Sequence, residues 1–137
     1  MAHVAIVGAG VMGTALAWPL SDNGHRISLV GTPLDREIIE EAQSRYRHPK
    51  LGRELPPGVT AYQTEELAAA IEDADLIVSG VNSWGVDWIA DALAESLARG
   101  RDVIGVTKGF RSDEAGDIEI FPRVLAGRVP AAIREHT

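Results

Sequence analysis

A glycine-rich turn near the N-terminus constrains the fold of this chain more than any other feature. An apolar run at residues 4–7 comes directly before the turn, and a helical pattern begins directly after it. The turn itself reads Gly8-Ala9-Gly10-Val11-Met12-Gly13. This order of buried strand, glycine turn and helix is typical of a βαβ unit whose turn approaches a phosphate closely.

Each glycine of the turn has a separate physical role. Gly8 lets the backbone leave the strand, Gly10 leaves no side chain between a phosphate and the main chain, and Gly13 lets helix and strand pack closely. The first N–H groups of the helix lack acceptors and carry about half a positive charge, so they attract an anion. We therefore expect a pyrophosphate to contact Gly8, Gly10, Val11, Met12 and Gly13. The alternative is a glycine-rich turn in another kind of α/β protein.

Length, charge and cysteine content exclude several classes of protein. The chain has 137 residues, a formal net charge of −7 and no cysteine. This length corresponds to one domain with a sizeable core, and disulfides and thiolate metal sites are excluded. The negative charge disfavours non-specific binding to nucleic acid or to an anionic membrane surface. The N-terminal segment indicates neither a signal peptide nor a membrane span, so we expect a cytoplasmic protein.

The first half of the chain predicts alternating strands and helices. Strands at residues 4–7 and 27–30 flank a helix that runs from residue 12 to about residue 22. A second helix is predicted from Pro33 to about residue 46. The segment 48–58 is rich in proline and glycine, so we expect an ordered loop there without regular structure.

The alternation continues through the second half. A short strand at residues 59–62 precedes a helix that Thr64 is expected to cap, and an apolar strand spans residues 74–81. A further helix ending at Gly100 is predicted by an apolar stripe of Val86, Ile89, Leu93 and Leu97. The apolar run at residues 103–106 predicts a fifth strand of the buried, parallel kind.

Five strands joined by crossover helices predict an α/β fold with a doubly wound parallel sheet, a Rossmann dinucleotide-binding domain over residues 1–125. In such a sheet a ligand binds at the carboxyl ends of the strands. The candidate binding segments are therefore residues 8–13, 31–33, 82–84 and 107–110.

The segment after the second strand bears on the choice between NAD and NADP. A carboxylate there accepts a hydrogen bond from the adenosine ribose and repels a 2′-phosphate. This chain has Gly31 and Thr32 instead, so Thr32 can donate to a phosphate and Arg36 can provide a counter-charge. Alternatively, Arg36 is a solvated residue on the first turn of its helix. NAD and NADP both remain candidate cofactors.

Two further strand ends carry polar residues. Asn82 and Ser83 lie where they can hydrogen-bond the nicotinamide ribose, although Ser83 can equally cap the following helix. Trp84 and Trp88 are four residues apart and are expected to pack as a pair. Lys108 is a cation at the end of the fifth strand, suited to hold a phosphate or polarise an oxygen, unless it is an ordinary surface lysine.

None of the four histidines has a partner at the spacing of a metal site or a catalytic triad, so no metal site is predicted.

These motifs together resemble the N-terminal domain of NAD(P)-dependent glycerol-3-phosphate dehydrogenase. The resemblance runs in order over about residues 3–125, and it includes the glycine turn, the proline-bearing loop at 48–59, the segment 74–83 and Thr107-Lys108-Gly109. The resemblance implies an oxidoreductase that binds a small phosphate substrate and interconverts glycerol 3-phosphate and dihydroxyacetone phosphate. It also implies that Lys108 is a catalytic residue that contacts the substrate.

The sequence departs from the family pattern at several points. The family usually has proline at Asn82 and often an arginine near Thr32. Family members also continue into a helical substrate domain with a second lysine, which is absent here, and residues 126–137 resemble the approach to it. We therefore expect an inactive fragment of a longer enzyme, for which a homodimer is a candidate assembly. The alternatives are a stand-alone nucleotide-binding or sensing module, or a dehydrogenase of this fold with another substrate.

Overall fold

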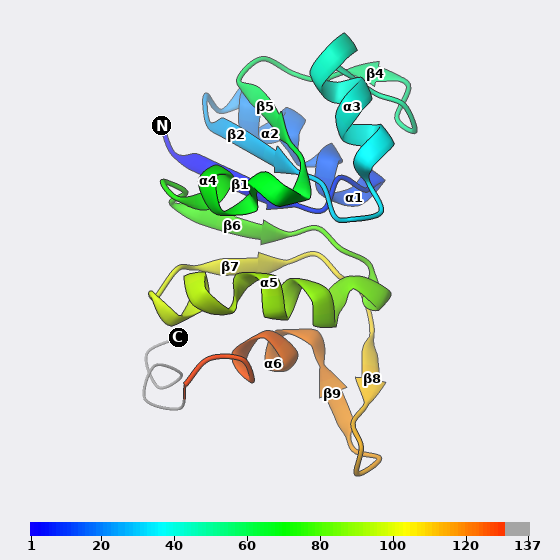
Figure 1. The fold of residues 1–137 in the computed structure, drawn as a ribbon, viewed down its shortest axis with the longest axis vertical. Coiled ribbons are helices and arrows are strands. Elements are labelled where there is room, and N and C mark those ends of the chain that lie inside the picture. The colour runs from blue at the N-terminus through cyan, green and yellow to red at the C-terminus, as the bar shows by residue number, and fades with distance from the viewer. Residues whose placement is uncertain (131–137) are drawn as a thin grey trace.

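The structure, a computed structural model, describes residues 1–130. Its centre is a five-stranded parallel sheet in the order β5-β2-β1-β6-β7 (Figure 1). The strands are β1 (His3–Val7), β2 (Arg26–Val30), β5 (Val59–Tyr62), β6 (Leu76–Ser79) and β7 (Val103–Gly105). The predicted doubly wound sheet is confirmed. Because the chain moves outward from β1 to β5 and then returns to β6, the strand order reverses between β1 and β6.

Helices cover both faces of the sheet, since alternate strand residues point to opposite sides. Val4 and Ile6 of β1 pack in a cluster with α2 and α3, while Ala5 and Val7 pack with α4, α5 and α6. The helices are α1 (Val11–Ala15), α2 (Ala17–Asp22), α3 (Arg36–Arg45), α4 (Leu67–Ile71), α5 (Val86–Ala98) and α6 (Phe121–Ala126). The apolar stripe predicted along α5 is buried, as expected.

The helix predicted over residues 12–22 forms as two short helices, α1 and α2, that meet at Leu16. The cause is Pro19, which has no N–H to donate to the carbonyl of Ala15 and whose ring crowds that carbonyl. Leu16 N–H donates instead to the Gly13 carbonyl at 3.2 Å, which tightens the turn. An apolar pattern alone therefore predicts a continuous helix where a proline divides it.

Other local predictions are wrong at element ends. α3 begins at Arg36 rather than at Pro33, because Asp35 occupies its N-cap position. The predicted loop contains an antiparallel hairpin of β3 (Arg47–His48) and β4 (Arg53–Glu54). The 3-10 helix η1 (Thr64–Glu66) is capped by Gln63 in a capping box with Glu66, and not by Thr64.

Strand β7 is more exposed than its apolar sequence predicts. It forms an edge of the sheet, and within residues 1–130 no strand pairs with its outer side. Val103 is half-buried, and Ile104 is 53% exposed. Its position in the sheet, rather than its composition, therefore decides its burial.

A second antiparallel hairpin, of β8 (Phe110–Ser112) and β9 (Ile118–Ile120), projects away from the sheet (Figure 1). One ion pair connects it to α5, in which Arg111 of β8 donates to Asp87 at 2.6 Å. Arg111 also donates to Glu119 of β9 at 2.9 Å, within the hairpin. The hydrogen bond from Arg111 holds the pKa of Asp87 below its ordinary value. These contacts anchor the segment that directly follows Lys108.

The core continues to Val129, which is buried beside α6. Of the tail predicted at residues 126–137, residues 131–137 lie outside the described residues. No helix in the described part of the chain is both long and apolar enough to cross a membrane.

The ion pair of Asp87 leads to a prediction about acid. Its pKa in the folded state is lowered, so the stabilisation is present above the ordinary aspartate value of about 3.9 and is lost as the pH falls through the lowered pKa. After correction for intrinsic rates, amide exchange of β8 and β9 should be constant between about pH 7 and pH 5 and faster below about pH 4. Asp87→Asn should accelerate it at neutral pH. Equal exchange in the variant and the wild type at neutral pH would contradict this prediction.

Candidate functional site

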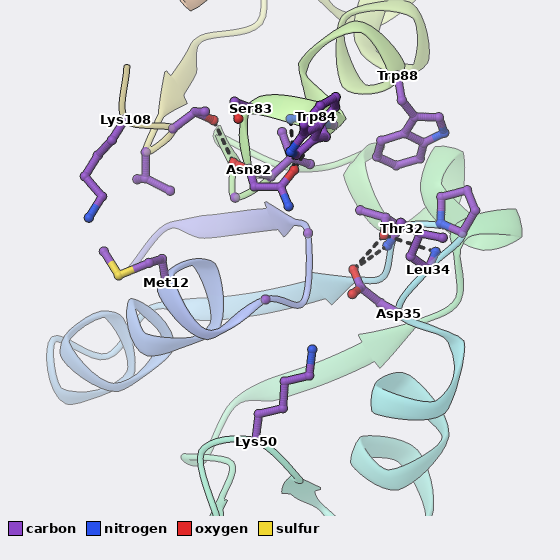
Figure 2. Close-up of a pocket in the computed structure, with 18 residues that line it drawn as sticks. Met12, Thr32, Leu34, Asp35, Lys50, Asn82, Ser83, Trp84, Trp88 and Lys108 are labelled. Atoms are coloured by element: carbon purple, nitrogen blue, oxygen red, sulfur yellow. Dashed lines mark hydrogen bonds between the residues drawn. The ribbon is translucent and has the colours of Figure 1, made fainter. Parts of the chain in front are cut away.

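A cavity of about 830 Å³ lies at the carboxyl ends of β1, β2, β6 and β7 (Figure 2). Its volume falls within the range of about 300–1,000 Å³ that is usual for small-molecule sites. All four segments expected at this edge contribute to its lining, and the β3–β4 hairpin adds a fifth. The polar and charged side chains in the lining are Thr32, Asp35, Lys50, Asn82, Ser83, Thr107 and Lys108.

Three glycines bring the backbones of β1, α1 and β6 into direct contact beneath the cavity. A Cβ atom on Gly13 would lie 2.6 Å from the Gly8 carbonyl oxygen, and one on Gly80 would lie 3.0 Å from the same atom. Gly8 itself has φ +113, and a Cβ there would lie 2.8 Å from the Gly80 carbonyl carbon. No side chain fits at these three positions, because every near neighbour is backbone.

Gly10 differs from these glycines, because no neighbouring atom within residues 1–130 would prevent a side chain at this position. A Cβ there would have no neighbour nearer than the Gly80 carbonyl oxygen at 4.0 Å, and the φ of −70° suits any residue. Gly10 lines the cavity. A side chain on Gly10 would therefore occupy part of the cavity, over the start of α1.

The peptide groups at Ala9 join three segments of the site. Ala9 N–H donates to Asp35 Oδ2 at 3.1 Å, at the start of α3. Its carbonyl accepts a hydrogen bond from Nε2 of the fully buried His48 at 2.8 Å, in the β3–β4 hairpin. Because Leu51 N–H donates to His48 Nδ1, Nε2 is the protonated nitrogen of a neutral ring. The glycine turn is thus bonded to both neighbouring loops.

The Asp35 carboxylate lies a few residues after β2, although Gly31 and Thr32, which directly follow the strand, carry none. Asp35 Oδ2 accepts from Thr32 N–H at 2.9 Å and from the Thr32 hydroxyl at 2.8 Å (Figure 2). The hydroxyl proton of Thr32 is therefore already donated. Arg36 forms an ion pair with Glu65 and does not line the cavity.

Asn82, and not Ser83, caps the helix that follows β6. Its Oδ1 accepts hydrogen bonds from Trp84 N–H at 3.0 Å and from Gly85 N–H at 3.1 Å, at the 3-10 helix η2 (Ser83–Gly85). Trp84 is 93% exposed and so does not form the packed pair expected with the half-buried Trp88. Both tryptophans line the cavity instead.

Lys108 lies on an anchored loop. The Thr107 hydroxyl donates to the Val81 carbonyl at 2.7 Å, which connects the end of β7 to the end of β6. Gly109 has φ +108, a conformation that favours glycine. In Figure 2, Lys108 lies on the side of the cavity where Met12 lies, away from Asp35.

The cavity contains most, but not all, of the residues predicted to contact the cofactor. It includes Gly8, Gly10, Met12, Thr32, Asn82 and Ser83, together with Lys108. Its lining does not include Val11, Gly13 or Arg36. Among residues 1–130, no three His, Cys, Asp or Glu side chains form a group that could hold a metal ion.

The sequence reasoning missed Gly80, Asp35 and Lys50. Asp35 had a usable signal, since it lies about twenty residues beyond the glycine turn, where a ribose-binding acid is common. Gly80 and Lys50 had no sequence signal as clear as that of Asp35, because their place in the site depends on contacts between segments that are distant in the sequence.

A parallel sheet with a glycine turn at the point where the strand order reverses, and a cavity above that turn, defines the class of Rossmann dinucleotide-binding domains. Within this class, residues 3–133 match the family described as NAD-dependent glycerol-3-phosphate dehydrogenase N-terminus. The chain belongs to this family.

Individual relatives agree with this assignment. An NADP(+)-dependent glycerol-3-phosphate dehydrogenase of Archaeoglobus fulgidus is 41% identical over 83 residues, which are 61% of this chain and 24% of the relative. A glycerol-3-phosphate dehydrogenase of Desulfitobacterium hafniense, named for NAD(P)+, is 35% identical over 131 residues, 95% of this chain and 35% of the relative. The glycerol-3-phosphate dehydrogenase structure from Coxiella burnetii has a TM-score of 0.79 at 22% identity, covering 93% of this chain and 38% of that one. The chain thus spans between about a quarter and two fifths of the length of the curated relatives that it matches.

The glycine contacts predict different effects of an added methyl group at two positions. Gly13→Ala should lower the free energy of unfolding by about 1–3 kcal/mol, because its Cβ would overlap the Gly8 carbonyl. Gly10→Ala should lower it by less than half as much, because its Cβ would meet only the Gly80 carbonyl oxygen, at an unstrained 4.0 Å. Urea unfolding of both variants measures this difference, and equal losses would show that the two glycines do not differ in packing.

Proposed function

We propose that the chain binds NAD or NADP across the glycine turn and forms the cofactor-binding part of a glycerol-3-phosphate dehydrogenase. The observation that carries this proposal is the space above Gly10, which lines the cavity although no contact within residues 1–130 requires glycine there. A pyrophosphate needs this close approach to the main chain, and the unpaired N–H groups at the start of a helix suit its charge.

The cavity residues fit the two ends of such a cofactor. Thr32 and Asp35 follow β2, where the adenosine ribose binds in this fold class, and Asp35 Oδ1 has no donor among residues 1–130. Asn82 follows β6, and its side-chain NH₂ group remains available to a ribose because only Oδ1 is used by the helix cap. Lys108 lies beyond, at the nicotinamide end of this arrangement.

In the proposed reaction, glycerol 3-phosphate loses a hydride from C2 and the proton of its C2 hydroxyl, and becomes dihydroxyacetone phosphate. The nicotinamide, when bound, accepts the hydride or returns it in the reverse direction. Lys108 would hold its ammonium near the C2 oxygen and stabilise the negative charge that develops there. The proton acceptor and the groups that hold the substrate phosphate would come from the helical domain that the family resemblance implies. Residues 1–137 alone are therefore expected to bind cofactor without catalysis.

Binding of the cofactor is tested by calorimetry with NADH and NADPH on the chain and on Gly10→Val. The valine side chain should occupy the space for the pyrophosphate and remove most of the affinity for both dinucleotides. Gly105→Val is a suitable control, because Gly105 also has open space around it and does not line this cavity. Equal affinity of wild type and Gly10→Val would exclude binding across this turn.

The role of Lys108 is tested by steady-state kinetics in the longer protein that carries this chain. Lys108→Ala should lower turnover of dihydroxyacetone phosphate by two or more orders of magnitude, about 2.7 kcal/mol or more, because a preorganised charge is lost. The control is Arg99→Ala, which removes a cation that is paired with Glu95 at the end of α5, outside the cavity. Near-normal turnover of Lys108→Ala would mean that Lys108 is an ordinary surface lysine.

A further inference from the structure

The lysines of this chain are confined to the cavity. The sequence has only two, Lys50 and Lys108, and both line it, whereas none of the arginines within residues 1–130 does. The ionisable residues of the described lining are these lysines and Asp35. The cavity is therefore cationic in a chain with a net charge of −7, which is an arrangement that concentrates an anion.

The Lys50 ammonium has no polar partner among residues 1–130. It is exposed, and no hydrogen bond or ion pair within residues 1–130 involves its side chain. The arginines on either side of it are occupied, since Arg47 donates to the Gly52 carbonyl and Arg53 lies 4.8 Å from the centre of the Trp18 ring. The Lys50 ammonium is thus the cation of this hairpin that has no partner among residues 1–130.

Bonds to the glycine turn determine where Lys50 lies. His48, two positions earlier, is fully buried and bonded to the Ala9 carbonyl, and Leu51 N–H is bonded back to His48. Asp35 holds the N–H of the same residue, Ala9. In Figure 2, Lys50 points toward Asp35 and the glycine turn, on the opposite side of the turn from Lys108. The two lysines therefore face different ends of the cavity.

On the basis of the proposed function, we infer that Lys50 binds the 2′-phosphate of NADP, and that Asp35 opposes this binding and accepts the ribose hydroxyl of NAD. A compact ammonium suits a phosphate, whereas a carboxylate repels it and suits a hydroxyl donor. The balance between these two opposite charges at the adenosine end determines which cofactor is preferred. This role differs from that of Lys108, which faces the reacting end.

Thr32 and Arg36, which the sequence suggested as ligands of this phosphate, already have other partners. The Thr32 hydroxyl already donates to Asp35, so it has no proton free for a phosphate oxygen. Arg36 would need to leave its ion pair with Glu65 and enter a cavity that it does not line. Lys50 needs to break no contact.

The test is calorimetric titration of the 137-residue chain with NADH and NADPH, with the ratio of Kd for NADH to Kd for NADPH as the readout. Lys50→Met should lower this ratio at least tenfold, and Asp35→Asn, which keeps an acceptor oxygen, should raise it at least threefold. Arg53→Met removes the same charge from the same hairpin outside the cavity, and its ratio should stay within twofold of the wild type. Raising the ionic strength should also lower the wild-type ratio, and should do so much less in Lys50→Met.

The outcomes separate this inference from the proposed function. If the wild type binds neither dinucleotide, the proposed function fails and the inference fails with it. If the wild type binds but Lys50→Met weakens NADH and NADPH equally, Lys50 acts on the shared pyrophosphate, and the inference alone is overturned. It is also overturned if Arg36→Met, and not Lys50→Met, lowers the ratio. A selective loss of NADPH in Lys50→Met supports it.

Discussion

The site depends on a backbone contact that only glycine permits. Gly8 at the end of β1, Gly13 in α1 and Gly80 after β6 approach so closely that a Cβ on any of them would meet main-chain atoms within about 3 Å. This contact joins the two strands between which the sheet reverses its order, and it lowers α1 onto them. The cavity exists because the backbone is packed here without side chains, while Gly10 above it remains open.

Hydrogen bonds at Ala9 then determine what surrounds that opening. Its N–H holds Asp35 and its carbonyl holds His48, so the loop after β2 and the β3–β4 hairpin are both attached to the turn. These bonds bring a carboxylate and Lys50 to one end of the cavity, whereas Thr107 anchors the loop of Lys108 at the other. A chain with an excess of acidic residues thereby has a cavity in which two lysines outnumber one aspartate.

The sequence predicted the sheet and the order of its elements well, because apolar runs and an amphipathic helix are local patterns. It predicted element ends poorly. Pro19 divides a helix whose apolar pattern is continuous, and Gln63 and Asn82 act as caps where Thr64 and Ser83 were expected. At both helix starts, two adjacent residues have side chains that can act as an N-cap. Which of the two caps the helix depends on backbone angles that neighbouring segments impose. The exposure of Ile104 likewise follows from the edge position of β7.

By itself, the sequence determined the fold class, the glycine turn, the family and the four segments at strand ends that line the cavity. It also predicted that Lys108 lies at this edge of the sheet, where it lines the cavity, because a cation at a strand end is visible in a local motif. Only the tertiary structure decided which other charged side chains line the cavity. Arg36, near in sequence, is held outside by Glu65, whereas Lys50, far from the turn in sequence, is brought in by His48. The physical reason is that local patterns specify strands and helices, while charge placement in a cavity depends on contacts between segments that only folding brings together.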